Sequence, residues 1–414
     1  MELLGTLLLM MGRVLLNIFT APHLLLLYLL LFLLVAWQYR RLQNVSESLL
    51  LKPRGDYLKS AVISTLLGVL GGILGSLLLV LVGTDLSDIG ITYLWITALA
   101  LMFIQPRFLC FAYAAGVLAI SNLLWGFPSI SIPQLMGLVA ILHMVESFLI
   151  LLNGPINPLP VYIKKSGRLR GGFNIQLFWP IPLVALMSLG LADPGYAGLE
   201  MPVWWPLLQD YSGFSDSKAF AMLPVLAILG YGEITTTQSA RQASRKSALL
   251  LFQFSLVLLL LAILSARSAY FLPLAAIFSP LGHELVIWLG MRNENRRGLY
   301  VQPSFGIMVL DVLPGSPAER AGLKSRDIIL NINGQPLDGF AAWQEHLKAG
   351  RSELLLKMQR NGRMVDALIK VSGNSHPGII PVPDESAGKF LVVEDDYIFS
   401  LARRLWRRML EGKF

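Results

Sequence analysis

The stretch VLPGSPAERAGLKSRDIILNING, from Val312 to Gly334, decides the fold of the C-terminal part of the chain. Ser316 and Glu319 stand at the spacing of a capping box, so a short helix is predicted to begin there. Strand-like apolar runs flank this helix, GIMVLDVL at 306–313 and DIILNI at 327–332. Two strands around a short capped helix indicate a small α+β domain.

The sequence beyond this stretch continues the same domain. DGFAAWQEHLKAG predicts a second helix capped by Asp338, with an apolar side formed by Phe340, Trp343 and Leu347. An Asn-Gly pair at 361–362 separates two apolar runs, which is a strong hairpin signal.

The order of these elements, with V-L-P-G-S-P-A-x-x-A-G-L followed by D-I-I-L-x-I-N-G, resembles a bacterial PDZ domain over residues 292–372. Such domains bind an extended peptide as an added strand beside one helix. The family usually has glycine where this chain has Arg326. The resemblance implies a loop and pairing edge from Arg296 to Gln302, containing Arg297, Gly298, Leu299, Tyr300 and Val301, and an opposite wall with Phe340, Gln344 and Leu347. Arg297 has two interpretations of equal weight, a charge at the peptide carboxylate or the basic flank of a membrane span.

The rest of the chain has the composition of a membrane protein. Of its 414 residues, 55% are hydrophobic and 14% are charged, and the mean hydropathy is +0.61. The fold class is therefore a polytopic α-helical membrane bundle at 20–290, followed by the PDZ-like domain and a C-terminal amphipathic helix. Nine spans are predicted, with eight as the rival count: Thr20 to Trp37, Ala61 to Gly83, Ile91 to Gln105, Phe108 to Phe127, Ile132 to Leu152, Leu177 to Ala192, Ala219 to Tyr231, Ala248 to Ala266, and Tyr270 to Gly290. The third and fourth are also compatible with a helical hairpin closed at Pro106.

The distribution of Lys and Arg predicts the orientation, because basic loops stay in the cytoplasm. With nine spans, the N-terminus lies outside and the chain after Gly290 lies in the cytoplasm. The net charge of +8 is explained by these flanks, so no nucleic-acid partner is expected. The basic loops contain Arg40, Arg41, Lys52, Arg54, Lys59, Arg107, Lys164, Lys165, Arg168, Arg170, Arg241, Arg245 and Lys246.

Small residues in the second span predict close packing. Gly68, Gly71, Gly72 and Gly75 form two overlapping G-x-x-x-G spacings, which favour approach of a neighbouring helix inside the bundle over a homodimer face. FWPIP, at 178–182, predicts a kink or a delayed start of the sixth span.

The stretch PLGHELVIWLG, from Pro280 to Gly290, raises the question of a zinc protease. A zincin helix needs H-E-x-x-H, and the second His position is Ile287. The pair, together with NPLP at 157–160, resembles site-2 intramembrane metalloproteases, but the ligand set is incomplete. The alternative interpretation, a site-2-type protease or its inactive relative, therefore ranks below hydrogen bonding between helices, and no metal or cofactor is predicted. The intramembrane polar candidates are His143, Glu146, His283 and Glu284. Cys110, the single cysteine, excludes a disulfide or a cysteine cluster and is assigned to helix packing.

The ends of the chain have their own signals. Residues 1–19 are predicted as an interfacial or re-entrant segment broken at Arg13, and 373–395 as a linker. Residues 396–414 predict a basic amphipathic helix for anionic lipids or an acidic partner, with packing on the PDZ-like domain as the alternative. Its surface residues are Arg403, Arg404, Trp406, Arg407 and Arg408.

The layout of many spans and one C-terminal PDZ-like domain resembles the MinJ family, cell-division topological determinants of Gram-positive bacteria. The resemblance implies a non-enzymatic scaffold that links the polar protein DivIVA to the division-inhibiting ATPase MinD. It further implies a multi-pass protein of the cell membrane, enriched at septa and poles, with homo-oligomerisation left open. Another PDZ membrane adaptor is the second interpretation of the same layout.

Overall fold

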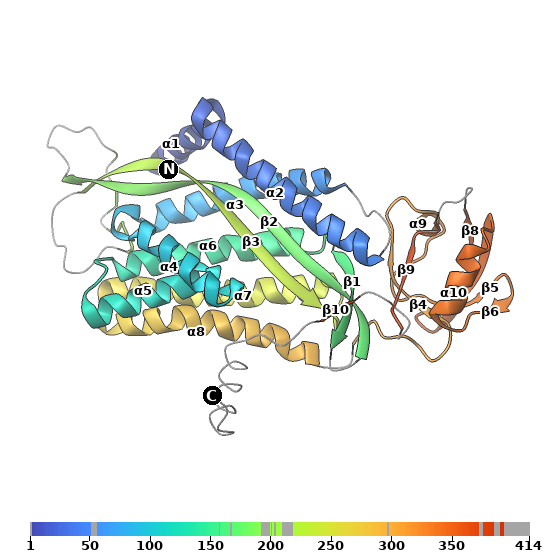
Figure 1. Ribbon diagram of the computed structural model, residues 1–414. Helices are drawn as coiled ribbons and strands as arrows, with labels where there is room; N and C mark the ends of the chain where they lie inside the picture. Colours follow the sequence, from blue (N-terminus) through green and yellow to red (C-terminus); the bar gives the residue numbers. More distant parts are fainter. Residues whose placement is uncertain are drawn as a thin grey trace, which may run out of the picture.

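The computed structural model describes residues 2–50, 56–156, 158–165, 168–191, 199, 201–202, 204–208, 218–295, 298–371, 376–384 and 390–392. Helices form one elongated bundle, a long β-hairpin runs along it, and a small domain sits at one end (Figure 1). The chain is a multi-pass membrane protein by the length and composition of its helices. Among the described residues, six helices are long and apolar enough to cross a bilayer: α1 (Glu2–Thr20), α2 (Pro22–Leu50), α3 (Tyr57–Val82), α6 (Ile132–Asn153), α7 (Ala240–Arg267) and α8 (Leu272–Met291).

The N-terminal segment differs from its prediction. Helix α1 is continuous through Arg13, and it is itself long and apolar enough to be counted as a span. One arginine near the middle of an otherwise apolar helix does not break it, because its long side chain can reach a more polar depth.

Two shorter helices form the hairpin that the sequence allowed. Helix α4 (Ile91–Ile104) and helix α5 (Phe111–Trp125) are joined by the 3-10 turn η2 (Pro106–Leu109). Fourteen residues of helix rise about 21 Å, which is less than a hydrocarbon core of about 30 Å. From these lengths we infer a re-entrant hairpin, whose tip contacts α6 through Cys110 and α8 through Arg107. Arg107, assigned from sequence to a basic cytoplasmic loop, is at this tip.

Two predicted helical spans are strands instead. The segments predicted at 177–192 and 219–231 lie in β2 (Arg168–Leu191) and β3 (Lys218–Thr235), which pair antiparallel over most of their length. Strand β1 (Leu159–Lys165) pairs with β2, and β10 (Leu391–Val392) pairs with β1, giving the order β10-β1-β2-β3. The prediction failed because an apolar run of this length satisfies the hydropathy of a helix and of a strand equally well.

The prolines of β2 explain why this strand is tolerated beside the helices. An edge strand exposes N–H groups that lipid cannot satisfy, and proline has none to expose. Pro180 and Pro182 occupy successive positions on the β2 edge that faces the helices. Three further amides on this edge donate to helix or turn side chains: Phe178 to the Tyr39 hydroxyl (3.3 Å), Val184 to Ser76 Oγ (2.8 Å) and Ser188 to Asp85 Oδ1 (3.0 Å).

Gly68 and Gly72 of α3 pack against strand β2 and not against a helix. Gly68 faces the carbonyl of Pro180, and Gly72 faces the carbonyl of Pro182. A Cβ atom on either glycine would overlap the carbonyl oxygen. Packing inside the bundle, as predicted, is thus what the glycines serve, but the neighbour is a β-strand edge, which needs the same close backbone approach.

The C-terminal domain has the predicted order of elements. Its sheet runs β8-β7-β5-β4-β9, with the two-residue strand β6 paired to β5. The core contains Trp343, Ile329 and Leu356, all buried. Ser316 caps the first helix by accepting from the Glu319 amide, but the Glu319 carboxylate accepts from the Gly315 amide and not from Ser316, so the capping box is only half formed. The Asn-Gly hairpin is present between β7 and β8. The elements are β4 (Ile307–Val312), α9 (Pro317–Arg320), β5 (Ile328–Ile332), β6 (Gln335–Pro336), α10 (Gly339–Lys348), β7 (Glu353–Arg360), β8 (Arg363–Lys370) and β9 (Ile379–Pro381).

The predicted linker at 373–395 is not only a linker. Its run Ile379 to Val382 pairs with β4, and Leu391 and Val392 pair with β1. The Pro and Gly residues around this run concealed a short apolar strand. The basic tail, including Arg403, Arg404, Trp406, Arg407 and Arg408, lies outside the described residues and stays a prediction.

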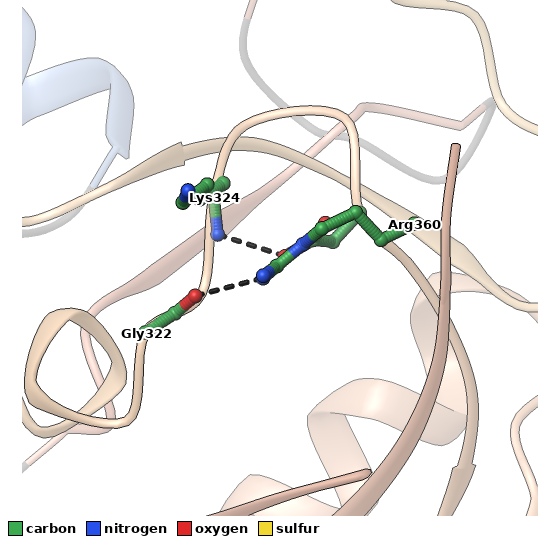
Figure 2. A network of polar contacts seen from close by, with 4 residues as sticks. Gly322, Lys324 and Arg360 are labelled. Atoms are coloured by element: carbon green, nitrogen blue, oxygen red, sulfur yellow. Dashed lines mark hydrogen bonds and ion pairs between the residues drawn. The ribbon is translucent and has the colours of Figure 1, made fainter. Parts of the chain in front are cut away.

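A charged network holds the loop between α9 and β5 (Figure 2). Asp327 is 1% exposed and accepts from Arg360 Nε at 2.8 Å and from Arg360 Nη2 at 2.6 Å. The Lys324 amide donates to the same carboxylate, and Arg360 also donates to the Gly322 carbonyl. Arg360 donates these hydrogen bonds to the Asp327 carboxylate, which raises the pKa of Arg360, so the guanidinium stays charged.

Arg326, which replaces the usual glycine of the family, pays a conformational cost. Its φ is 74°, in the left-handed region that a residue with a Cβ rarely adopts. We expect Arg326→Gly to raise the free energy of unfolding of the domain by about 1 kcal/mol. Urea denaturation of the full chain in detergent, followed by Trp343 fluorescence, measures the effect. An unchanged or lower midpoint would contradict it, and Arg363→Gly, at an exposed strand end, is the control for loss of an arginine.

Candidate functional site

The three residues predicted to form the peptide wall lie on α10, at the surface of the C-terminal domain. Gln344 is exposed, while Phe340 and Leu347 are half-buried and pack against the domain core. The Asp338 side chain makes no capping hydrogen bond, and the Phe340 amide instead donates to Asp384 at 3.1 Å. The helix is therefore tied to the residues that follow β9.

The predicted pairing edge is not free. The Leu299 amide donates to the Thr236 carbonyl at 2.8 Å, and the Tyr300 carbonyl accepts from the Gly171 amide at 2.9 Å. These bonds join the edge to the β2–β3 sheet, so a peptide cannot use the same groups. Gly298 and Val301 lie on either side of this contact, and Arg297 falls outside the described residues.

Side chains reinforce this junction between the C-terminal domain and the membrane region. Tyr300 is 2% exposed, and its ring meets that of Phe173 edge-on, with centroids 5.3 Å apart. Burial raises the pKa of the Tyr300 hydroxyl, so the ring stays neutral. The Tyr162 hydroxyl donates to the Pro381 carbonyl at 2.9 Å and covers part of the outer edge of β9.

Glu294, just after α8, is the main polar contact of the junction. Its carboxylate accepts from the Thr236 amide at 2.7 Å and from the hydroxyls of Thr235, Thr236 and Thr237 at 3.0, 2.8 and 2.7 Å. A carboxylate with this many donors is held in one orientation. Glu294, before the C-terminal domain, and Leu299, at its start, both bond to Thr236, which docks this end of the domain on the sheet.

A second polar cluster lies inside the helix bundle. Cys110 Sγ is 3.1 Å from His143 Nε2 and 3.6 Å from His283 Nε2. Cys110 is the N-cap residue of α5 at the tip of the re-entrant hairpin, whereas His143 and His283 lie near the middle of α6 and α8. The histidines predicted as separate polar candidates are therefore brought together, with their ring centroids 5.2 Å apart.

Glu284 has a different role from its neighbour His283. It is fully buried, accepts from the Tyr113 hydroxyl at 2.8 Å and pairs with Arg107 at 3.4 Å. The buried carboxylate is thus neutralised by a cation and is not aimed at the three convergent atoms. Glu284 thus joins α8 to α5 through Tyr113 and to the turn η2 through Arg107.

Glu146, predicted only as a polar candidate inside the membrane, lies one turn from His143 and is not among the described residues whose ligand atoms converge. One prediction for this cluster needs correction. Cys110 was assigned to plain packing, but its sulfur contacts both imidazoles. Its position at the tip of a possible helical hairpin, next to Arg107, was the only signal in the sequence.

Together, the fold and the docked domain define a class, multi-pass membrane proteins with a C-terminal PDZ domain. Residues 308–360 match the PDZ domain family. The chain is MinJ-like: it is similar to the cell division topological determinant MinJ of Bacillus subtilis (strain 168), with 29% identity over 210 residues, which are 49% of this chain and 51% of MinJ.

Other relatives share a shorter stretch. The periplasmic serine endoprotease DegP of Escherichia coli (strain K12) is 32% identical over 88 residues, 20% of this chain and 18% of DegP. The putative serine protease HhoA of Synechocystis sp. (strain ATCC 27184 / PCC 6803 / Kazusa) is 33% identical over 88 residues, 20% of this chain and 22% of HhoA. The chain thus spans about half the length of MinJ and about a fifth of these proteases. These matches have about the length of one PDZ domain, so they do not show that this chain is a protease.

Proposed function

We propose that this chain is a membrane scaffold of bacterial cell division, which positions other proteins through its PDZ domain. The observation that carries the proposal is the docking of that domain on the membrane sheet through Glu294, Leu299 and Tyr300. A domain of a peptide-binding class, held in one orientation at the end of a bundle, can present a bound partner at a fixed place relative to the bilayer. The similarity to MinJ supports division as the process.

The proposed side of the membrane is the cytoplasm. Basic residues gather at the bundle end that carries the PDZ domain, around the C-terminal part of α2, strand β1 and the start of α7 (Figure 1). Positively charged flanks favour the cytoplasmic side. Arg107 is not part of this basic end, because it pairs with Glu284. The charge at this end favours the cytoplasm whatever the number of helical spans.

The proposed peptide site is the exposed side of α10, with Phe340, Gln344 and Leu347 as its wall. The edge formed by Leu299 and Tyr300 acts as an anchor of the domain and not as the receiving strand. By the MinJ resemblance, the proposed partners are a DivIVA-like polar protein and a MinD-like ATPase. Membrane lipids are the other proposed partner, in contact with the helix bundle. Binding of the polar protein and the ATPase would enrich the chain at septa and poles.

Blocking the proposed wall tests the function. Gln344→Trp fills the wall with a bulky side chain. Glu345→Trp adds the same side chain at the next exposed position of α10, outside the wall, and is the control. In cells carrying a fluorescent full-length fusion, we expect the native chain and Glu345→Trp to concentrate at septa, and Gln344→Trp to spread over the membrane. Pull-down of division proteins by the full chain in detergent should follow the same pattern. Uniform membrane staining of the native fusion, with no division proteins retained, would overturn the proposal.

A further inference from the structure

We propose that Cys110, His143 and His283 bind a Zn²⁺ ion inside the membrane bundle. Their ligand atoms, one thiol sulfur and two imidazole nitrogens, all lie within 4.8 Å of one another. Sulfur and imidazole nitrogen are the ligand types that Zn²⁺ prefers, and three protein ligands with one open position are a common zinc arrangement. This site is independent of the proposed scaffold function, and it uses His283 without the second histidine that an H-E-x-x-H pattern requires.

The spacing of the atoms fits such an ion. Zinc bonds of about 2.3 Å to sulfur and about 2.0 Å to nitrogen, at tetrahedral angles, separate the sulfur from each nitrogen by about 3.5 Å. The observed separations are 3.1 Å for His143 and 3.6 Å for His283. Each sulfur-to-nitrogen separation is thus within a few tenths of an ångström of this value.

Hydrogen bonds on the far side of each ring orient the nitrogens that face the sulfur. His143 Nδ1 lies 2.7 Å from the Val139 carbonyl, which can only accept, so Nδ1 carries the proton and Nε2 has a free lone pair. His283 Nδ1 lies 3.3 Å from the Tyr113 hydroxyl, whose own proton goes to Glu284. The same tautomer follows for His283. Supporting bonds of this kind are typical of metal-bound histidines.

A thiol alone does not satisfy this arrangement. A Cys S–H has a single proton to donate, but both Nε2 lone pairs point toward the same sulfur. One imidazole would then remain a buried acceptor with a weak partner, which costs about 1 to 3 kcal/mol. A metal ion with a thiolate satisfies all three atoms together.

Charges around the cluster are compatible with a cation. Arg107 is the nearest basic group at the hairpin tip, and its pairing with Glu284 offsets its charge. Glu146 lies one turn along α6 from His143. The thiolate of Cys110 would offset one of the two positive charges of the ion.

The position of the ligands indicates what the ion does. They come from three elements, the hairpin tip before α5, the middle of α6 and the middle of α8. The hairpin is too short to cross the bilayer, so a metal bond fixes its tip against two long helices. The fourth position is left to water or a small ligand.

Metal content of the full chain tests the proposal. After purification in detergent without chelator, elemental analysis should give close to one zinc ion per chain. Cys110→Ser should lose it, and serine is a suitable replacement because it favours the N-cap position of α5. His346→Gln, a histidine of the PDZ domain, should keep its zinc. Absence of zinc from the native chain and failure to take it up from buffered Zn²⁺ would overturn the proposal, as would equal zinc in Cys110→Ser. Copper in place of zinc would overturn the choice of ion.

A spectroscopic measurement separates binding from folding. Co²⁺ loaded into the native chain should give a thiolate-to-cobalt charge-transfer band and tetrahedral ligand-field bands. Both should disappear in Cys110→Ser and weaken in His283→Gln, while circular dichroism reports whether each variant keeps its helices. A folded native chain that shows no thiolate band with Co²⁺ contradicts the site.

Discussion

Replacing Gly72 with alanine is expected to lower the free energy of unfolding of the membrane region by about 3 kcal/mol or more. The added Cβ would overlap the carbonyl oxygen of Pro182, which is backbone and cannot rotate away. Separating α3 from β2 would also stretch the bond from the Val184 amide to Ser76 Oγ. Thermal unfolding of the purified full chain in detergent, with yield from membranes as a second measure, detects this loss.

Gly12→Ala is the matched control for this change. Gly12 lies within a helix, and a Cβ there meets nothing within 4 Å. Alanine is the better helix former, so the control should melt at the same temperature as the native chain or slightly higher. If Gly72→Ala also melts with the native chain, the close contact between α3 and the strand edge is not present.

Asp327→Ala is expected to cost the C-terminal domain about 3 kcal/mol. The substitution leaves the Arg360 guanidinium and the Lys324 amide without their common acceptor. The loop between α9 and β5 should then open first. Limited proteolysis of the full chain should show faster cutting near 322–326, and urea denaturation should show a lower midpoint for this domain.

Asp366→Ala controls for loss of a carboxylate in the same domain. Asp366 is exposed on β8, where surface substitutions usually change stability by less than about 0.5 kcal/mol. Equal midpoints for Asp327→Ala and Asp366→Ala would contradict this prediction, because the expected loss depends on burial of the Asp327 carboxylate.

The domain at the C-terminus was predictable because its signals are local. The Ser316 cap of α9, the Asn-Gly turn at 361–362 and the apolar side of α10 each act over a few residues. A chain folds such segments in nearly the same way wherever they occur, so the order of elements follows from reading them in turn. The peptide edge was different, since Leu299 and Tyr300 pair with residues more than sixty positions away in the sequence.

The β2–β3 hairpin is the part of the membrane region where prediction from hydropathy was wrong. Hydropathy identifies a segment that prefers lipid, but it does not say how the backbone satisfies its hydrogen bonds. In β2, that choice depends on β3, on Tyr39 and Ser76, and on prolines that remove donors from one edge. The glycines of α3 likewise predicted a close approach without naming the strand that makes it.

The sequence by itself determined that this chain has apolar segments for a bilayer and a PDZ-like domain after them, because hydropathy and turn chemistry are properties of short stretches. Only the tertiary structure decided that α4 and α5 re-enter, that the PDZ domain is docked through Glu294, and that Cys110 meets two histidines. These contacts join residues far apart along the chain, and their distances are set by how helices and strands pack.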